Sequence, residues 1–191
     1  RGVDVSGFKV LYELLAVSKG NLRVTEIPLN FRSRQAGDSK LDNAVVWDWL
    51  VSLVHTATFR LLPRRAVSFG MVGISGMVVH VGLYALLRSL GVGFFGTQVV
   101  AVITAACSNY LINNSLTFRS RRLRGRSLFI GLLKFLLVSS LGMAANVGVS
   151  TVVFASLQGG PIAMIAVASG ILVDFIWKYA ASSRFVWNVP Y

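Results

Sequence analysis

The stretch FGMVGISGMVVHVGL, residues 69–83, recurs in altered form as FLLVSSLGMAANVGV at residues 135–149. At an offset of 66 residues, the two copies share their first phenylalanine and a Gly-Met pair that begins at Gly76 and at Gly142. Each copy lies in an apolar run close to the ~20 residues with which an α-helix crosses a bilayer. The repeat therefore predicts a membrane protein built from two related halves.

Four apolar runs follow one another along the second part of the chain. They cover residues 67–87, 94–113, 135–156 and 161–181. We expect residues 66–187 to form a domain of four transmembrane helices, arranged as two repeated hairpins. Because both hairpins start and end on the same side of the membrane, this is a parallel repeat and not the inverted repeat of many transporters.

The second helix of each hairpin carries polar residues that also repeat. At an offset of 65 residues, Asn109-Tyr110 lies over Asp174-Phe175. Lys178 follows Asp174 by four residues, so a local ion pair with a lysine that extends toward the membrane surface is the structural interpretation. A functional interpretation stays open, because ionisable groups inside a membrane are costly and usually have a role.

Two further polar residues and one cysteine lie within the apolar runs. His80 and Asn146 occupy equivalent positions in the first helices of the hairpins. We interpret them as residues that hydrogen-bond between helices, with a substrate path as the alternative. Cys107, the only cysteine, is interpreted as a small packing residue.

Composition and charge support the membrane interpretation. The chain is 54% apolar and 14% charged, with a mean hydropathy of +0.67, which is typical of several membrane spans. Residues 44–191 carry 19 − 7 = 12 basic and 7 − 5 = 2 acidic residues. This excess indicates a bias toward the cytoplasmic face rather than binding to nucleic acid.

The arginines are distributed unevenly between the loops. The loop between the second and third runs holds Arg119, Arg121, Arg122, Arg124 and Arg126, whereas the other two connections hold only Arg88 or no charge. Cytoplasmic loops carry the excess of lysine and arginine in membrane proteins. We therefore expect a multi-pass protein of the plasma membrane with this loop and both termini in the cytoplasm.

Residues 44–65 are expected to form an amphipathic helix and a linker. Asp48, Ser52, His55 and Thr56 recur on one helical stripe, while the remaining positions include two tryptophans and several aliphatic residues. Tryptophans and a basic end are typical of a helix that lies in the membrane interface. A transmembrane helix is the alternative for this segment.

Residues 1–43 have the character of soluble α/β protein. A helix is expected over residues 7–17, with Ser6 as its N-cap. Ile27, Leu29 and Phe31 alternate with polar residues and predict a half-buried strand. One helix and one strand cannot enclose a core, so we expect these residues to be the C-terminal part of a larger domain whose N-terminal portion precedes residue 1.

The segment FRSRQAGDSKL, residues 31–41, joins the soluble and membrane parts. Arg32, Arg34, Ser39 and Lys40 surround a glycine there, and such a basic turn is suited to bind phosphate. The alternative is that these cations set topology and contact lipid head groups. No catalytic set or metal-binding motif can be assembled from this sequence.

Both parts of the chain resemble known families. GFKVLYELL (7–15) and VTEIPLNFRSRQAGDSKL (24–41) resemble the end of the catalytic domain of polyprenyl-phosphate mannose synthases, also called dolichol-phosphate mannose synthases, of glycosyltransferase family 2. The matching positions are Glu26, Pro28, Phe31, Arg34, Gly37, Asp38, Ser39, Lys40 and Leu41. SNYLINNSLTF (108–118) resembles the helix-end motif of the GtrA-like transmembrane domain, and DFIWKYAASSRFVW (174–187) follows it more loosely, with Asp174 in place of asparagine.

These resemblances imply an activity for the full-length protein. It would transfer mannose from GDP-mannose, or another sugar from its nucleotide, to a polyprenyl or dolichyl phosphate at the cytoplasmic face. The enzyme's catalytic domain would be GT-A-like and hold Mg²⁺ or Mn²⁺ on residues that this chain lacks. By the resemblance, Arg34 lies near the phosphates of donor or lipid, with Arg32, Ser39 and Lys40 beside it.

Two alternatives differ in class from a transferase. A GtrA-like carrier or flippase would move a polyprenyl-phosphate-linked sugar across the bilayer, and a polar path through the bundle would favour it. The other alternative is that residues 44–191 only assemble copies of the chain into a homo-oligomer.

Overall fold

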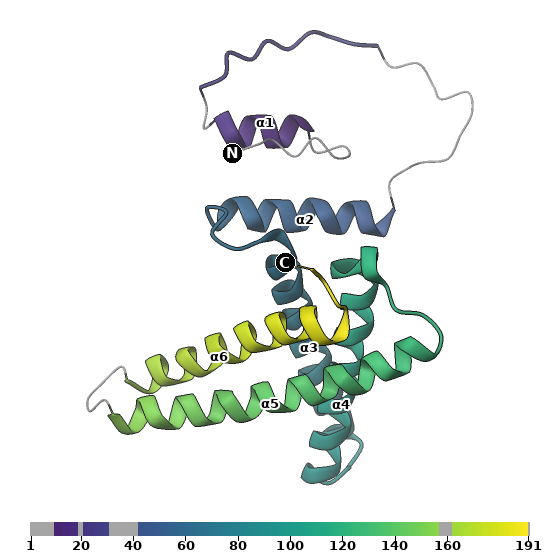
Figure 1. Cartoon of the computed structure of the whole chain (residues 1–191), viewed down its shortest axis with the longest axis vertical. Helices are drawn as coiled ribbons and strands as arrows, with labels where there is room; N and C mark the ends of the chain where they lie inside the picture. The colour runs from purple at the N-terminus through teal and green to yellow at the C-terminus, as the bar shows by residue number, and fades with distance from the viewer. Residues whose placement is uncertain (1–9, 19–20, 31–41, 157–161, 191) are drawn as a thin grey trace. The chain divides into compact units, whose positions relative to one another are not determined.

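The computed structural model describes residues 10–18, 21–30, 42–156 and 162–190 (Figure 1). The chain divides into two compact units, Arg1–Arg64 and Arg65–Tyr191. The described residues are mainly α-helical, as the sequence predicts.

In the first unit, the described residues form the helices α1 (Val10–Ser18) and α2 (Asn43–Ala57). Helix α2 begins where it does because Asp42 is its N-cap, and the Val45 backbone N–H donates to Asp42 Oδ1 at 2.8 Å. It ends at Ala57, earlier than expected, because Phe59 and Arg60 adopt φ angles of 53° and 58°. The interfacial position of α2 stays a prediction.

The predicted strand does not form in the described part of its range. Residues 21–30 contain no strand, and the Ile27 and Leu29 side chains are 82% and 72% exposed. A strand is stable only when its backbone groups pair with a neighbouring strand, and no described residue offers that pairing. Phe31 and Ser6, which the sequence interpretation also used, lie outside the described residues.

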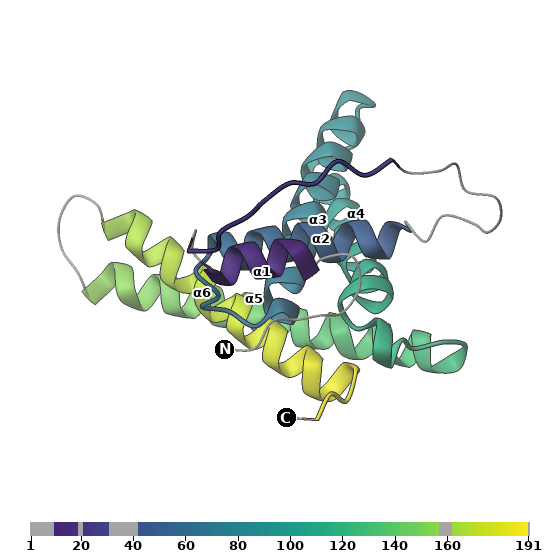
Figure 2. The same ribbon diagram turned by 90° about the horizontal axis from the view of Figure 1, so that it is seen from above.

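The second unit is formed by α3 (Arg64–Ser89), α4 (Phe94–Ile112), α5 (Arg126–Ser156) and α6 (Ile162–Ala181). Among the described residues these are four helices long and apolar enough to cross a membrane. The four predicted spans are therefore confirmed. Helix α5 starts at Arg126, before the predicted span, because the apolar residues 128–133 continue the helix on the N-terminal side of Lys134. Helices α5 and α6 lie side by side (Figures 1 and 2).

Helices α4 and α6 both continue into a π-helical turn. The two turns are Asn113–Thr117 and Ser182–Val186, an offset of 69 residues from Asn113 to Ser182. The alignment of Asn109 with Asp174 has an offset of 65 residues. The two offsets differ by four residues, which is about one helical turn, so both align the same faces of α4 and α6. Lys178, rather than Asp174, is therefore the counterpart of Asn109 when the helix ends are aligned.

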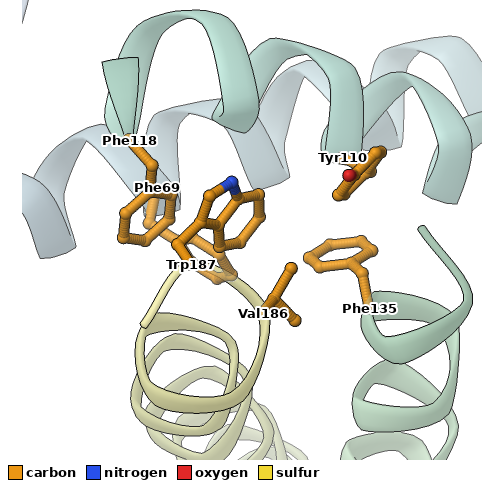
Figure 3. Packing of buried hydrophobic residues seen from close by; sticks show 6 residues of the cluster. All are labelled: Phe69, Tyr110, Phe118, Phe135, Val186 and Trp187. Carbon is orange, nitrogen blue, oxygen red and sulfur yellow. The ribbon is translucent and has the colours of Figure 1, made fainter. Parts of the chain in front are cut away.

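One aromatic cluster joins all four helices at their common end (Figure 3). Its buried members are Phe69, Tyr110, Phe118, Phe135, Val186 and Trp187. The Trp187 indole stacks on the Phe118 ring with centroids 4.1 Å apart and planes 10° apart, and it contacts Phe135 edge-on at 5.9 Å. Phe69 and Phe135 are equivalent in the repeat, so the cluster forms where the two halves meet.

Asn114 connects this cluster to the arginine-rich loop. Its Oδ1 accepts hydrogen bonds from the Trp187 indole N–H at 3.1 Å and from the Leu123 backbone N–H at 2.8 Å. Its Nδ2 donates to the Leu123 carbonyl at 3.1 Å, and the Tyr110 hydroxyl donates to the Leu128 carbonyl at 2.7 Å. The two bonds to Leu123 satisfy backbone groups of the loop that helix hydrogen bonds do not reach.

We predict that Trp187→Ala destabilises the second unit by about 3–5 kcal/mol, because it removes a buried aromatic side chain that packs against Tyr110, Phe118 and Phe135. Phe185→Ala is the matched control, since the Phe185 side chain is 62% exposed and the Trp187 side chain is 2% exposed. The stability of each variant is measured by thermal unfolding of the detergent-solubilised protein. Equal melting temperatures for the two variants would contradict the role assigned to Trp187.

Candidate functional site

The phosphate-binding residues expected from the sequence are Arg32, Arg34, Ser39 and Lys40, and all four lie outside the described residues. Their arrangement and their role as a phosphate site stay predictions. The described residues contain a different polar site, which lies inside the four-helix unit.

A cavity of about 510 Å³ lies between the four helices. Most of its wall is apolar and comes from α3, α4, α5 and α6. The polar side chains that line it are His80, Asn109, Asn113, Ser139, Asp174 and Lys178. Its volume falls within the range of about 300–1,000 Å³ that is usual for small-molecule pockets.

The repeated glycines place two of these polar side chains. A Cβ atom on Gly76 would collide with the Asn109 carboxamide, and one on Gly142 would collide with the Asp174 carboxylate. The glycine of each repeat copy thus lets the second helix of the same hairpin approach closely with a polar residue at the contact. The sequence showed these glycines as a repeat but did not show what they contact.

Asp174 and Lys178 form the ion pair that their spacing predicts. Lys178 Nζ lies 2.7 Å from Asp174 Oδ2, and the two side chains are 26% and 18% exposed. The pair leaves Asp174 Oδ1 buried without a hydrogen-bond partner. One carboxylate oxygen is therefore held by lysine while the other remains free to accept.

The cavity wall holds further buried polar atoms without partners. Among the described residues these include Asn109 Oδ1, Asn113 Oδ1 and His80 Nε2. The Asn113 side chain is 1% exposed, and its Nδ2 donates to the Asn109 carbonyl at 2.9 Å, which fixes its oxygen as the free atom. A buried polar atom without a partner costs about 1–3 kcal/mol, so their grouping here is unusual.

His80 and Asn146 differ although their positions in the repeat are equivalent. His80 lines the cavity, whereas Asn146 Oδ1 accepts from the Ser150 hydroxyl at 3.3 Å within α5. The hydrogen bond of Asn146 thus lies within one helix, and no described residue of another helix forms the predicted bond with it. The Asn146 side chain instead packs against Gly170 of α6.

The described residues offer no site for the divalent metal that the resemblance implies. No group of three or more histidine, cysteine, aspartate or glutamate side chains lies close together within this part of the chain. Cys107 is a free, half-buried cysteine in α4. Within the described residues, the geometry thus supports binding in the cavity.

These features define a multi-pass membrane protein whose four-helix domain holds a mainly apolar cavity with several polar side chains in its wall. The sequence model of the family described as GtrA/DPMS, transmembrane domain, matches residues 68–187. This match covers more than half of the chain, and the chain belongs to this family.

Two relatives extend the comparison beyond the membrane domain. The chain is 31% identical over 188 residues to a dolichol-phosphate mannosyltransferase of Pyrococcus furiosus, across 97% of this chain and 52% of that protein. It is 29% identical over 90 residues to a dolichol-phosphate mannosyltransferase of Mycosarcoma maydis, across 47% of this chain and 30% of that protein. The chain thus spans about half the length of the archaeal relative and less of the fungal one.

Sequence interpretation did not single out Asn113 and Asn114. Both belong to the SNYLINNSLTF stretch, and their position in this helix-end motif is the sequence feature that could have identified them. Their roles differ, because Asn114 forms hydrogen bonds with the arginine-rich loop, whereas Asn113 lines the cavity.

We predict that Gly76→Ala and Gly142→Ala each destabilise the four-helix domain by roughly 1–3 kcal/mol, because the added methyl has to displace Asn109 or Asp174. Gly82→Ala and Gly148→Ala are matched controls further along the same helices, where a Cβ atom meets nothing within 4 Å. These controls should melt at or above the wild-type temperature, since alanine favours a helix more than glycine does. Similar effects at all four positions would refute the proposed close contacts.

Proposed function

We propose that the chain is the acceptor-side and membrane-anchoring part of an enzyme that transfers mannose from GDP-mannose to dolichyl or polyprenyl phosphate. The observation that carries this proposal is the alignment of 97% of the chain with a protein named dolichol-phosphate mannosyltransferase. The alignment includes the segment before the membrane domain, so it supports a transferase and not only a membrane module.

The basic turn at residues 31–41 supplies the chemistry that this part of the enzyme needs. Arg34, with Arg32, Ser39 and Lys40, would bind phosphate oxygens of the nucleotide sugar or of the lipid. Positive charge at that point stabilises the negative charge that develops on the leaving diphosphate. Mg²⁺ or Mn²⁺ would neutralise the donor diphosphate when bound in the full-length enzyme, on residues outside this chain.

The membrane domain would hold this turn at the cytoplasmic surface. The aromatic cluster brings together the start of α3, the ends of α4 and α6 and the first part of α5. The arginine-rich loop leaves from the same end of the domain, where Asn114 binds it. Since lysine and arginine favour the cytoplasmic side, both loop and basic turn would face the nucleotide sugar there.

A carrier of polyprenyl-phosphate-linked sugar is the second candidate, and the polar cavity favours it. The cavity lies among membrane-spanning residues and is lined by an ion pair and unpaired amide oxygens. A bundle that served only as an anchor would have no need of such groups, because they are costly in a membrane.

The transferase proposal is tested with the full-length protein in membranes, labelled GDP-mannose, a short polyprenyl phosphate and Mg²⁺ or Mn²⁺. We expect label in the lipid, and a loss of about 100-fold or more in Arg34→Ala and Lys40→Ala, because each removes a cation from the phosphates. Arg23→Ala is the matched control, since Arg23 is exposed and precedes the resembling segment. Wild-type turnover in both site variants would refute the role of the turn, and no transfer from any nucleotide sugar would favour the carrier.

The topology is tested with single cysteines in a Cys107→Ser background. Arg124→Cys should resist an impermeant thiol reagent added to intact cells, because the arginine-rich loop is expected in the cytoplasm. Leu90→Cys should react readily, since Leu90 lies in the opposite connection and is 70% exposed. The reverse labelling pattern would overturn the proposed orientation.

A further inference from the structure

The arginine-rich loop has a defined backbone although its arginines are exposed. Both backbone groups of Leu123 bond to one side chain, because its N–H donates to Asn114 Oδ1 at 2.8 Å and its carbonyl accepts from Asn114 Nδ2 at 3.1 Å. The N–H and C=O of one residue point to the same side where the backbone is extended. The backbone of Arg122 is extended as well, with φ −56° and ψ 122°. Asn114 therefore holds a short extended segment in place at Leu123.

The two neighbours of Leu123 lie on the outer side of this segment. The Leu123 side chain faces inward, since it packs against the aromatic cluster and a Cβ atom on Gly131 would collide with it. Successive side chains of an extended backbone alternate, so Arg122 and Arg124 share the opposite side, and both are exposed. Two residues of extended chain separate their Cα atoms by about 6–7 Å. The loop thus presents two guanidinium groups side by side.

No acidic side chain in the described part of the chain neutralises this pair. Neither Arg122 nor Arg124 forms an ion pair with a described residue. Asp174 is the only acidic residue in residues 65–191, and it pairs with Lys178. A guanidinium presents a rigid fork of N–H donors that matches the oxygens of a phosphate. The pair therefore forms a surface suited to phosphate groups.

The position of the loop favours phosphate that belongs to a membrane lipid. The loop connects the spans formed by α4 and α5, so it lies where these helices leave the hydrocarbon. The first turns of α5 carry the apolar side chains of Phe129 and Leu133, which are 69% and 68% exposed. At a rise of ~1.5 Å per residue, Phe129 lies only about 4.5 Å along the helix from Arg126. Acyl chains and lipid head groups therefore meet beside the arginines.

We infer that the arginine-rich loop is a binding surface for anionic phospholipids, with Arg122 and Arg124 at the head-group phosphates and Phe129 and Leu133 against the acyl chains. A lipid with net negative charge is preferred to a zwitterionic one, because the arginines repel the cation of a zwitterionic head group. A loop that only set topology would need its charge but no fixed backbone. This role is independent of the cavity and of the proposed transfer.

The test measures lipid binding to the purified protein by native mass spectrometry. The probes are phosphatidylglycerol and phosphatidylcholine with the same acyl chains. We expect phosphatidylglycerol to bind at least about tenfold more tightly, since each arginine near a membrane surface favours anionic lipid. Equal dissociation constants for the two lipids would overturn the inference.

Replacing the pair, with Arg122→Gln and Arg124→Gln together, should reduce this preference to about threefold or less, because both guanidinium groups are lost. Arg121→Gln with Arg126→Gln is the matched control, since it removes the same charge from exposed positions of the same loop that do not flank Leu123. The control should keep most of the preference. An equal loss in both double variants would show that net charge alone selects the lipid, and would refute the paired arrangement.

Two further arms separate the backbone from the charge and the lipid from a free anion. Leu123→Gly keeps every arginine but removes the inward anchor, so the preference should fall by about threefold or more as the segment gains conformational freedom. An unchanged preference would refute the role of the extended segment. Inorganic phosphate should displace little phosphatidylglycerol, because it makes no contact with apolar side chains. Full displacement by inorganic phosphate would refute the assignment to a lipid.

Discussion

The stacked rings of Phe118 and Trp187 join the two hairpins, and the arrangement of the membrane domain depends on this contact. Within a bilayer, lipid tails are as apolar as the helices, so burial of apolar surface does little to bring helices together. Shape complementarity and hydrogen bonds have to do so instead. The aromatic cluster and Asn114 provide both at one end of the domain, where the chain also leaves the membrane.

Two related halves produce a site that is not symmetric. In one hairpin Gly76 contacts Asn109, a neutral amide, and in the other Gly142 contacts Asp174, which pairs with Lys178. The repeated glycines give both hairpins a close contact between their two helices, while the polar residues opposite the glycines differ in charge. A cavity between the halves can therefore bind different parts of one ligand on its two sides.

The membrane domain and the segment before it serve different chemical needs in the proposed enzyme. The proposed transfer involves phosphate groups, which cations stabilise, and residues 31–41 carry three basic residues in sequence. The cavity of the membrane domain instead combines unpaired acceptor oxygens with an apolar wall.

Sequence alone determined the four spans, their pairing as hairpins and the arginine-rich loop, because length, hydropathy and charge are local properties of the chain. The ion pair of Asp174 and Lys178 was also predictable, since four residues separate them on one helix. A strand over residues 27–31 was predicted from alternation, but alternation cannot report whether a partner strand exists.

Only the tertiary structure decided which polar atoms are satisfied. Asn113 and Asn114 are neighbours in sequence with the same side chain, yet one lines the cavity and the other bonds Leu123 and Trp187. Their difference arises from helices that are distant in sequence and meet at the aromatic cluster. Hydrogen-bond partners across helices depend on that packing, and no local pattern in the sequence contains it.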